Sequence, residues 1–507
     1  MSFQGKRHDY CLECRDAVHG FVYLSEAEWA IVDCPTFQRL RDIRQLAMAH
    51  LVYPGATHTR FEHSLGCVHL SDRIYEAVKR QVDRKQCPNF AKAYGADDEQ
   101  VGRGLQVVRL AALLHDLGHG PFSHTGENLM PKVNGRPITH EEMTARLIRH
   151  TEIKATLERE FDKDVVEEVI AVATAPHKAK LPEGANLAWL RFLNDILTGE
   201  LGSDRMDYLL RDAIHSGQSA GLFDHRKLID SMIIVRPPPE TGEDHRLGLD
   251  PAGWLVAEQM VAARYLMYVA LYFHKTKRIY EIHLEKFLAA WLRKKFREPF
   301  LPCANLKEYI SLTDSRVWSA IYEEARKTRG DLKGLAQPFV DRSHFRLARE
   351  VLLADNCAPA ASDETLKRFL AEHEAARKQE AGSVETIKAA LAAVRRNPRV
   401  WDANRLDKLR DALHDVRSQF GTIEIDEPKH HAVSFFGSGD KIWVSLNGET
   451  RYLDDLSEIV AGMPDKIWRG RIYADQSKRE DVKAFCDNWL RKNPCEGGRH
   501  EPAKGSG

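Results

Sequence analysis

The spacing of apolar positions divides the chain into three parts. Residues 1–35 form a short extended lead-in, in which strand-forming side chains surround Gly20. In residues 36–300 apolar side chains recur at the spacing of helices that bury one face. Residues 301–495 combine charged amphipathic helices with alternating strands. This pattern predicts a mainly α protein, with a helical core and a smaller α+β C-terminal lobe.

Several segments of the middle part carry the helical pattern clearly. In residues 37–46 an apolar stripe lies opposite Arg and Gln side chains. Residues 107–119 form the most apolar of the expected helices, so polar side chains there lie on a buried element. We also expect long helices in residues 188–215 and 255–292, and a hairpin with a Pro/Gly tip in residues 233–250.

The C-terminal part has a different character. It contains two charged amphipathic helical patterns, in residues 362–397 and 401–419, followed by short alternating segments. These segments predict strands at residues 422–426, 430–436, 441–447 and 471–475. The last residues, 496–507, are polar and rich in glycine, and we expect them to be disordered.

Composition narrows the class of protein. A chain of 507 residues exceeds a typical single core, so two or three folding units are expected. Basic and acidic residues balance at 74 each, so no global charge points to nucleic acid or to an anionic membrane. No apolar run approaches the roughly 18 residues that span a bilayer, and MSFQGKRHDY lacks the apolar stretch of a signal peptide. With nine scattered cysteines, these features favour a cytoplasmic protein without a membrane partner.

The strongest chemical signal is LLHDLGHGPFSH, at residues 113–124. His115 and Asp116 are adjacent on an apolar helix, and His119 lies four residues after His115, on the same helix face. Burying an unpaired carboxylate is costly, so Asp116 needs a partner or a metal ion. A satisfied buried pair near a helix end is the alternative, because the helix is broken by Gly118, Gly120 and Pro121.

Three further segments add metal-ligand side chains. HTRFEHSLG places Arg60 and His63 on one helical face, ITHEEMTARL opens a helix near His140, and LGSDRMDYLLRD contains Asp204. Two neutral imidazoles and two carboxylates suit a divalent ion such as Mg, Mn, Fe or Zn. Such an ion polarises a phosphoryl oxygen and activates water. The guanidinium groups of three further residues could donate paired hydrogen bonds to a triphosphate: Arg60, Arg205 and Arg264.

The order H…HD…D resembles the signature of HD-domain phosphohydrolases. FQRLRDIRQLAMAHLVYPGATHTRFEHSLG, HDLGHGPFSH and DRMDYLLRD are similar to the deoxynucleoside triphosphate (dNTP) triphosphohydrolases of that group. These include a vertebrate enzyme with a sterile-alpha-motif domain and bacterial dGTPases. The resemblance covers residues 12–300 and continues more weakly in HHAVSFF and RIYADQSKREDVKAF, without a preceding sterile-alpha-motif domain. It implies an HD-domain helical core over residues 36–300.

The resemblance implies a metal site and a reaction. The implied metal ligands are His63, His115, Asp116 and Asp204. It implies His119 and His140 as catalytic histidines, one stabilising the attacked α-phosphate and one protonating the departing sugar oxygen. Glu127 stands where the family has an acidic partner, here Glu in place of Asp.

The resemblance also implies a substrate site for a dNTP. Arg205 replaces a Lys of the family, and Phe273 stands where a relative carries Gln. The residues around the sugar 3'-hydroxyl, which exclude a 2'-hydroxyl, are implied to include Gln45, Asp212 and Tyr272. The full implied substrate set is Gln45, Leu46, Arg60, Arg205, Tyr208, Asp212, Arg264, Tyr272, His274 and Lys275.

A regulatory nucleotide site is implied as well. The residues that match it are Asp33, Gln38, Arg41 and Arg226. Leu12, Arg15, Asp250, Ala252 and Val256 depart from the family pattern, which favours a single activator, GTP or a dNTP, over two-nucleotide activation. The family also implies a homo-oligomer, as a dimer, tetramer or hexamer, and single-stranded nucleic acid is a further candidate partner.

Other functions and structural roles stay open at this point. An HD phosphodiesterase or nuclease acting on cyclic nucleotides, oligonucleotides or nucleic acid is one alternative, and a non-catalytic nucleotide sensor is another. Without the resemblance, Tyr208, Tyr265 and Tyr272 would be core aromatics, and Arg39 and Arg41 would be solvated helix charges. Histidines with no assigned role are His50, His58, His69, His124 and His215, of which His124 follows the HD motif.

Overall fold

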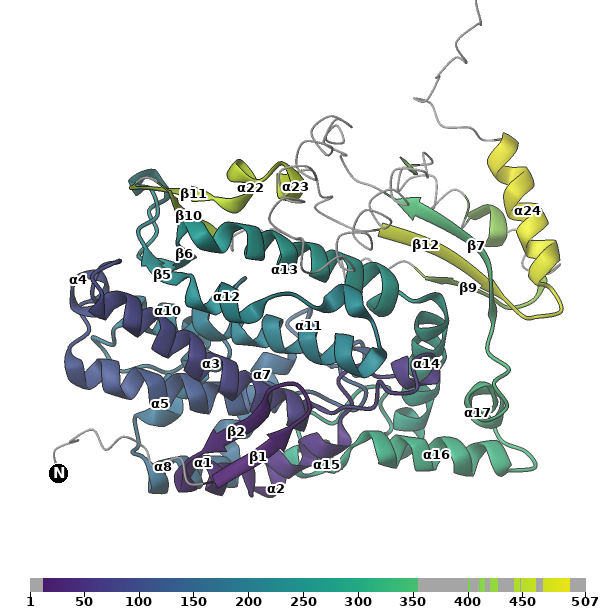
Figure 1. Cartoon of the computed structure of the whole chain (residues 1–507). Helices are drawn as coiled ribbons and strands as arrows, with labels where there is room; N and C mark the ends of the chain where they lie inside the picture. The colour runs from purple at the N-terminus through teal and green to yellow at the C-terminus, as the bar shows by residue number, and fades with distance from the viewer. Residues whose placement is uncertain are drawn as a thin grey trace, which may run out of the picture.

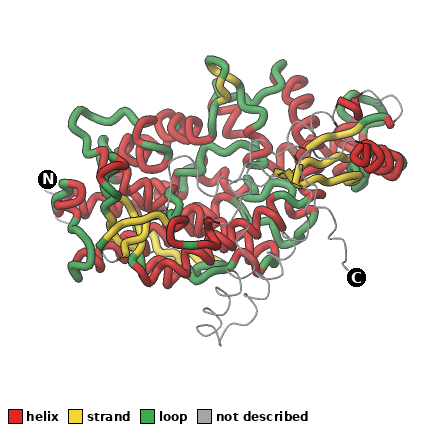
Figure 2. The backbone as a smooth tube through the Cα atoms, turned by 90° about the horizontal axis from the view of Figure 1, so that it is seen from above, coloured by secondary structure: helices red, strands yellow, loops and turns green. Residues whose placement is uncertain are grey.

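The computed structural model describes residues 12–353, and then 400–401, 409, 411–414, 420–426, 442–446, 448–461 and 468–492. The described part is mainly α, as expected, with small sheets set among and beside the helices (Figure 2). The expected helix at 362–397, the strand at 430–436, most of 401–419 and the tail lie outside the described residues. Within the described ranges, no helix combines the length and apolarity needed to cross a bilayer.

The lead-in forms an antiparallel hairpin of β1 (Leu12–Asp16) and β2 (Gly20–Leu24). The helix expected in residues 37–46 is wrong in length. It is split into α2 (Pro35–Gln38) and a 3-10 turn (Arg39–Asp42), and the chain becomes extended at Ile43. The physical reason is that Arg44 bridges to Thr59, and its backbone N–H donates to the Asp314 carboxylate at 3.1 Å.

Three helices form the centre of the core: α3 (Arg60–Asp83), α5 (Asp98–Leu114) and α11 (Ser203–Ser216). A Cβ on Gly66 of α3 would lie 1.9 Å from an Asp207 carboxylate oxygen on α11, so only glycine permits this helix contact. A Cβ on Gly118, just after α5, would lie 2.0 Å from the His140 carbonyl oxygen. Gly66 thus lets α3 approach α11, and Gly118 lets the end of α5 approach the start of α7 (His140–His150), where the chemistry-bearing side chains lie.

The two long helices predicted from the pattern are each interrupted. Residues 188–215 form α10 (Leu187–Thr198) and α11, joined by a tight turn. The second segment forms α13 (Trp254–Met267), a π-helical turn (Tyr268–Tyr272) and α14 (Lys275–Phe296). Helices α11 and α13 lie one above the other in the middle of Figure 1. The second interruption matters because Tyr268 and Tyr272 of the π-helical turn line the cavity described below.

The predicted hairpin is confirmed as β5 (Met232–Val235) and β6 (Arg246–Leu249). It is extended by β10 (Trp443–Leu446) and β11 (Glu449–Tyr452), giving the strand order β11-β10-β6-β5. The strand predicted at 441–447 is therefore present, but it completes a sheet of the helical core. That placement was not predicted, because nothing in the local pattern identifies a partner strand two hundred residues earlier.

A second sheet has the order β8-β7-β12-β9 and packs against α24 (Arg479–Lys492), at the upper right of Figure 1. Its small core is separate from the main one, which includes Leu301, Tyr309 and Ile321. The main core thus continues past residue 300. Three helices after residue 300 join the main core: α15 (Leu306–Ser311), α16 (Asp314–Arg326) and α17 (Lys333–Val340). The strands of the second sheet are β7 (Arg346–Leu353), β8 (Val400–Trp401), β9 (Ile423–Asp426) and β12 (Trp468–Ala474).

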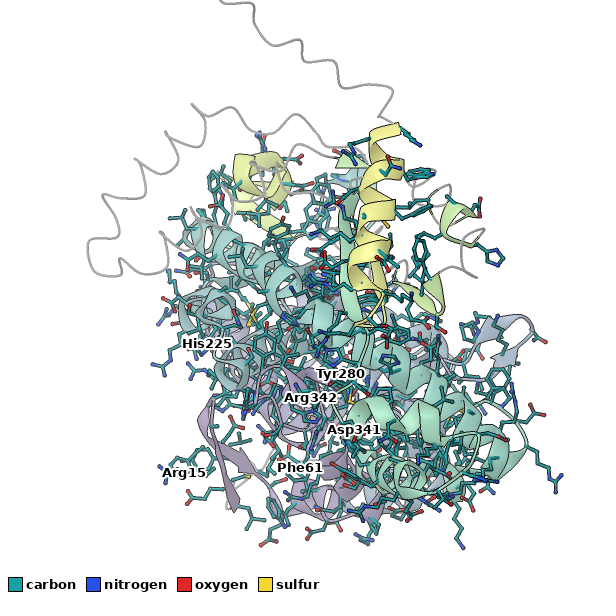
Figure 3. The ribbon with its side chains drawn as sticks, turned by 90° about the vertical axis from the view of Figure 1, so that its right-hand side faces the viewer. Arg15, Phe61, His225, Tyr280, Asp341 and Arg342 are labelled. Atoms are coloured by element: carbon teal, nitrogen blue, oxygen red, sulfur yellow. The ribbon has the colours of Figure 1, made fainter. Side chains whose placement is uncertain are left out.

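Polar contacts join the second sheet to α14. Arg278 of α14 donates to Asp426 of β9 at 2.8 Å, and the Tyr473 hydroxyl donates to the Lys275 carbonyl oxygen at 2.9 Å. Nearby, the Arg342 guanidinium lies over the Tyr280 ring, 5.7 Å from its centroid, as Figure 3 shows from that side.

The remaining helices are α1 (Glu26–Val32), α4 (Phe90–Tyr94), α6 (His124–Glu127), α7 (His140–His150), α8 (Glu152–Glu160), α9 (Val165–Ala173), α12 (His225–Asp230), α22 (Leu453–Leu456) and α23 (Glu458–Ala461). A small hairpin pairs β3 (Lys132–Val133) with β4 (Arg136–Pro137).

Candidate active site

The structure brings the four predicted metal ligands together. His63 comes from α3, Asp204 from the first turn of α11, and His115 and Asp116 from the turn that follows α5. The His63 Nε2 atom lies 3.0 Å from Asp204 Oδ1 and 3.6 Å from Asp116 Oδ2. The His115 Nε2 atom lies 3.5 Å from Asp116 Oδ1 and 3.7 Å from Asp204 Oδ1. Two imidazole nitrogens and two carboxylates therefore converge on one point, with the Asp204 side chain, 30% exposed, on its open side.

One detail of the helical expectation is wrong. Helix α5 ends at Leu114, so His115 and His119 do not share a helix face. The next residues form tight turns, in which the His119 N–H donates to the Asp116 carbonyl oxygen at 3.1 Å. The His119 Nε2 atom then lies 3.3 Å from Asp116 Oδ1, so it still reaches the cluster.

The outer nitrogens of the two ligand histidines are already engaged. The His63 Nδ1 atom lies 2.7 Å from Asp207 Oδ2, and the His115 Nδ1 atom lies 2.9 Å from the Ala112 carbonyl oxygen. Hydrogen bonds to these acceptors place the proton on Nδ1 and leave the Nε2 lone pairs facing the cluster. Among the described residues the buried His115 Nε2 has no hydrogen-bond partner, which is the environment a cation would complete. The donor set therefore fits a divalent metal ion.

Asp207 organises the layer behind the ligands. Its fully buried carboxylate accepts from His63, from His19 of the lead-in hairpin at 2.7 Å, and from Arg211 at 2.8 and 2.9 Å. Arg211 also donates to Asp16 at 2.8 Å. The lead-in hairpin thus helps to fix the orientation of His63, a predicted metal ligand, and the sequence analysis did not predict this role.

The predicted catalytic residues form a second cluster beside the first. The rings of His119 and His140 stack with centroids 4.1 Å apart. Glu127 Oε1 lies 2.6 Å from His140 Nδ1 and 3.1 Å from His119 Nδ1. Its other oxygen lies 3.2 Å from the Nδ1 atom of His124, the unassigned histidine that follows the motif. Three histidines therefore share one carboxylate.

The electrostatics of this second cluster favour an ionised Glu127. Burial opposes its charge, but His124 and His119 outweigh burial and hold the pKa of the carboxyl well below its usual range. Burial likewise lowers the pKa of His140, but the nearby Glu127 carboxylate outweighs it, so the pKa is raised overall. His140 with Glu127 is therefore a proton-holding pair next to the metal-ligand cluster.

Arg60 connects the clusters to a strained loop. It lies 2.5 Å from Asp116 Oδ2 through NH1 and donates from Nε to Ser123 Oγ at 2.8 Å. Phe122 and Ser123 have φ values of 58° and 54°, a left-handed conformation that costs free energy for residues with a Cβ. Buried Asp314 accepts the Phe122 N–H at 2.7 Å, which holds this conformation from α16. The sequence analysis assigned Asp314 no role.

A cavity of about 320 Å³ opens beside these groups. Six of the predicted substrate residues line it: Gln45, Leu46, Arg60, Tyr208, Asp212 and Tyr272. Its wall also contains Asn128, Tyr268, Phe273, Lys277, Arg278, Glu281 and Glu285, of which only Phe273 had been singled out. The additional side chains come mostly from the π-helical turn and α14, elements whose position follows from tertiary packing.

The residues predicted to surround the sugar 3'-hydroxyl are adjacent. The Tyr272 hydroxyl donates to Asp212 Oδ2 at 2.7 Å, and His58 Nε2 lies 2.7 Å from Asp212 Oδ1. The π-helical turn brings Tyr272 to α11, since it shifts the register of the helix before α14. His58, which had no predicted role, holds the other carboxylate oxygen.

Four predicted substrate residues do not line the cavity. Arg205 and Arg264 are both paired with Glu200, at 2.5 and 2.9 Å. His274 forms the N-cap of α14, where its Nδ1 accepts the Thr276 N–H at 3.3 Å. Lys275 lines a different cavity of about 360 Å³ beneath the second sheet.

The predicted regulatory residues are only partly together. Arg41 donates to the Gln38 side chain at 2.7 Å and stacks over the Phe61 ring at 3.5 Å, near the end of α1 where Asp33 is the C-cap. Arg226 lies on α12, a separate element. The neighbouring Arg39 is buried, not solvated, and donates to the His119 carbonyl oxygen at 2.8 Å.

Comparison with known proteins identifies the class that this fold and site define. Residues 60–212, which carry all four converging ligands, match the HD domain. The chain is 30% identical over 350 residues to the uncharacterized protein YwfO of Bacillus subtilis, covering 66% of this chain and 70% of that protein. The chain therefore belongs to the HD-domain family, and it resembles the family's dNTP triphosphohydrolases.

Two relatives with a named activity support that resemblance. A SAMHD1 homolog of Dictyostelium discoideum, named a deoxynucleoside triphosphate triphosphohydrolase, is 27% identical over 67% of this chain. Mouse SAMHD1, with the same name, is 31% identical over 45%. The chain spans 60% and 35% of their lengths. A solved structure of a hypothetical protein from Aquifex aeolicus aligns with a TM-score of 0.63 at 28% identity, over 93% of this chain and 99% of that one.

Proposed function

We propose that the protein is a metal-dependent phosphohydrolase that cleaves a deoxynucleoside triphosphate into a deoxynucleoside and triphosphate. The observation that carries this proposal is the position of Arg60, which contacts the ligand Asp116 and also lines the cavity. A phosphate held by Arg60 would therefore lie against the metal-ligand cluster.

The ion would be held by His63, His115, Asp116 and Asp204, whose side chains converge at the open face of Asp204. A divalent ion supplies Lewis-acid chemistry there, since it polarises a phosphoryl oxygen and makes water a better nucleophile at neutral pH. This donor set accepts several ions, among them Mg, Mn, Fe and Zn.

The second cluster handles the leaving group. The oxygen of water bonds to the α-phosphorus, and the bond from phosphorus to the sugar 5'-oxygen breaks. His140, with its proton stabilised by Glu127, gives that proton to the departing 5'-oxygen, while His119 lies between this pair and Asp116. The attacking water supplies the oxygen that completes the released triphosphate, and the proton that it loses replaces the one that His140 gave up.

The sugar is positioned by the carboxylate of Asp212. With one oxygen held by His58 and the other by the Tyr272 hydroxyl, this carboxylate is fixed in place at the cavity wall. A fixed acceptor can bind a 3'-hydroxyl, and the aromatic rings beside it leave little room for a 2'-hydroxyl. We propose that deoxy selectivity arises at this wall.

Regulation and assembly belong to the same proposal. The exposed Arg41, with Gln38 and Asp33, would contact an activating nucleotide, and the active form would be a homo-oligomer. The neutral overall charge gives no separate support for binding of single-stranded nucleic acid.

A direct experiment is incubation of the protein with each of the four dNTPs and the four NTPs, with Mg or Mn, and separation of the products. The proposal predicts release of intact triphosphate from dNTPs and much slower reaction of NTPs. Pyrophosphate or inorganic phosphate as the first product would contradict it. Cleavage of cyclic or oligomeric nucleotides instead would favour the phosphodiesterase or nuclease alternative.

A further inference from the structure

The turn between α10 and α11 carries a carboxylate that engages two arginines at once. Glu200 Oε1 lies 2.5 Å from Arg205 NH1, and Oε2 lies 2.9 Å from Arg264 NH1. The Glu200 side chain is 8% exposed, and those of Arg205 and Arg264 are 21% and 12% exposed. The three charges thus form a largely buried cluster with one net positive charge.

The arginine cluster lies next to the active site. Arg205 follows the metal-ligand residue Asp204 directly on α11, and Tyr208, one turn later, lines the cavity. Arg264 in turn stands one turn before Tyr268, which also lines the cavity, so both arginines lie on helix faces that continue into the cavity wall. A phosphate chain that leaves Arg60 along this wall would meet them.

Glu200 is held where it is by the backbone. The turn is closed by a hydrogen bond from the Gly202 N–H to the Gly199 carbonyl oxygen at 2.9 Å, and the Leu201 side chain is buried beside it. A carboxylate fixed in this way stays near the guanidiniums when an anion binds. It then competes for their N–H groups and repels the anion, in surroundings where charge interactions are stronger than in water.

We propose that Glu200 is a specificity-determining residue, which neutralises part of the phosphate-binding charge of Arg205 and Arg264 and weakens the binding of polyphosphates. This inference rests on the proposed function for its substrate class. Independently of the substrate, it states that Glu200 weakens the binding of an anion more strongly as the negative charge of that anion increases. Longer phosphate chains therefore gain most when the carboxylate is removed.

The test uses the full chain with Glu200→Gln, which keeps the size and hydrogen-bonding capacity of the side chain but removes its charge. Calorimetric titration with tripolyphosphate should show a dissociation constant about tenfold lower than wild type, equivalent to about 1.4 kcal/mol. The gain should be smaller for pyrophosphate and smallest for inorganic phosphate. Unchanged or weaker binding of tripolyphosphate overturns the proposal, because a carboxylate that only orients the arginines would give that result.

Two further variants keep the result interpretable. Glu168→Gln removes the same charge from another arginine pair, with Arg103 on α5, which does not line the cavity, and should leave tripolyphosphate binding unchanged. If circular dichroism shows that Glu200→Gln does not fold, the Glu200→Asp variant tests the proposal instead. It withdraws the carboxylate by one methylene and should strengthen binding in the same order of chain length, whereas equal or weaker binding overturns the proposal.

The outcome is separable from that of the proposed function. With dNTPs, Glu200→Gln should lower KM several-fold and change kcat much less. If neither protein releases triphosphate but Glu200→Gln binds tripolyphosphate more tightly, the proposed reaction fails and the role of Glu200 stands. If both release triphosphate with equal KM, the role of Glu200 fails alone.

Discussion

The metal-ligand cluster and the adjoining cavity are built on opposite electrostatic principles. In the cluster, acceptor atoms face one another: two imidazole nitrogens and two carboxylates converge, and the buried His115 Nε2 has no partner. Along the cavity, cations are already matched by anions. Arg60 is paired with Asp116, Lys277 with Glu281, and Arg278 with both Glu281 and Asp426.

The contrast shows where binding free energy is available. A cation entering the cluster would contact His115 Nε2, which has no hydrogen-bond partner within the described residues, and two carboxylates whose charge it would neutralise, so tight binding is expected. An anion entering the cavity must compete with carboxylates that already hold the arginines and lysines. Metal binding should therefore depend strongly on single residues, and phosphate binding should depend on a balance of charges.

The largest effect is expected from removal of a converging ligand. His115→Ala or Asp116→Ala should abolish metal content and lower the rate of hydrolysis by more than about 100-fold. Replacing a residue that only hydrogen-bonds to a metal ligand costs up to about 100-fold, and loss of the ligand itself should cost more. Metal content by mass spectrometry and circular dichroism would be measured on the same sample. His177→Ala, at an exposed position, is the control. Wild-type metal content in the His115 or Asp116 variant would contradict the assignment of the cluster.

The second largest effect should come from Asp207, which touches no ion but orients His63. Asp207→Asn should weaken metal binding by about 10- to 100-fold, because an amide no longer fixes the proton on Nδ1. Titration of the metal-free protein would measure this. Asp230→Asn, which alters an exposed pair with Arg80, should have no effect. An unchanged affinity would show that the hydrogen bond from His63 is dispensable.

Substitutions in the cavity wall should have weaker effects, and they should change the preference for dNTPs over NTPs more than the rate of hydrolysis. Tyr272→Phe removes the hydroxyl that donates to Asp212. We expect the ratio of kcat/KM for a dNTP over the matching NTP to fall about tenfold, the scale of one hydrogen bond to a charged group. Tyr322→Phe, at an exposed position on α16, is the matched control. A selectivity that does not change would remove Tyr272 from the sugar-binding wall.

Asp314 supplies a pH-dependent prediction. Burial raises its pKa to about 7, although the N–H groups of Phe122 and Arg44 partly offset burial. Because this carboxyl holds its proton more tightly in the folded protein than in the unfolded chain, it lowers the free energy of unfolding as the pH rises from about 4 to about 7. Wild type should therefore lose stability relative to Asp314→Asn between about pH 5 and about pH 8. Urea unfolding at both values checks this, and a constant difference between the proteins would refute it.

The smallest effect is expected at the regulatory residues. If GTP or dGTP changes the rate or the oligomeric state, Arg41→Ala should reduce that response by a few-fold while the rate without activator stays the same. The side chain is exposed and, within the part of the chain that the structure describes, contacts Gln38 and the Phe61 ring, so its loss should not unfold the protein. Sedimentation and initial rates with and without nucleotide would measure the response. No response of the wild type to any nucleotide would remove this site.

Local motifs explain how much of the site the sequence predicted. His115 and Asp116 are adjacent, His63 is one helical turn from Arg60, and His140 starts a helix behind a capping box formed by Thr139 and Glu142, so short-range rules placed them well. The helical core and the β5–β6 hairpin followed from periodicity for the same reason.

Residues that act across long sequence separations were not predictable from pattern. Asp314 reaches Phe122 from 192 positions away, and His19 reaches Asp207 from 188 positions away. Glu200 lies within the long helix expected in residues 188–215, and its pairing with Arg264, 64 positions later, depends on tertiary packing. Nothing in the spacing of apolar residues encodes such contacts, because periodicity specifies which face is buried and leaves the partner open.

Hydrolysis of a dNTP in water labelled with heavy oxygen tests the central claim most directly. The account predicts that the label appears once in the released triphosphate, on the phosphorus that was bonded to the sugar, and that the deoxynucleoside is unlabelled. Label in the deoxynucleoside would contradict attack at the α-phosphorus, and release of pyrophosphate in place of triphosphate would contradict breakage of the bond to the sugar 5'-oxygen.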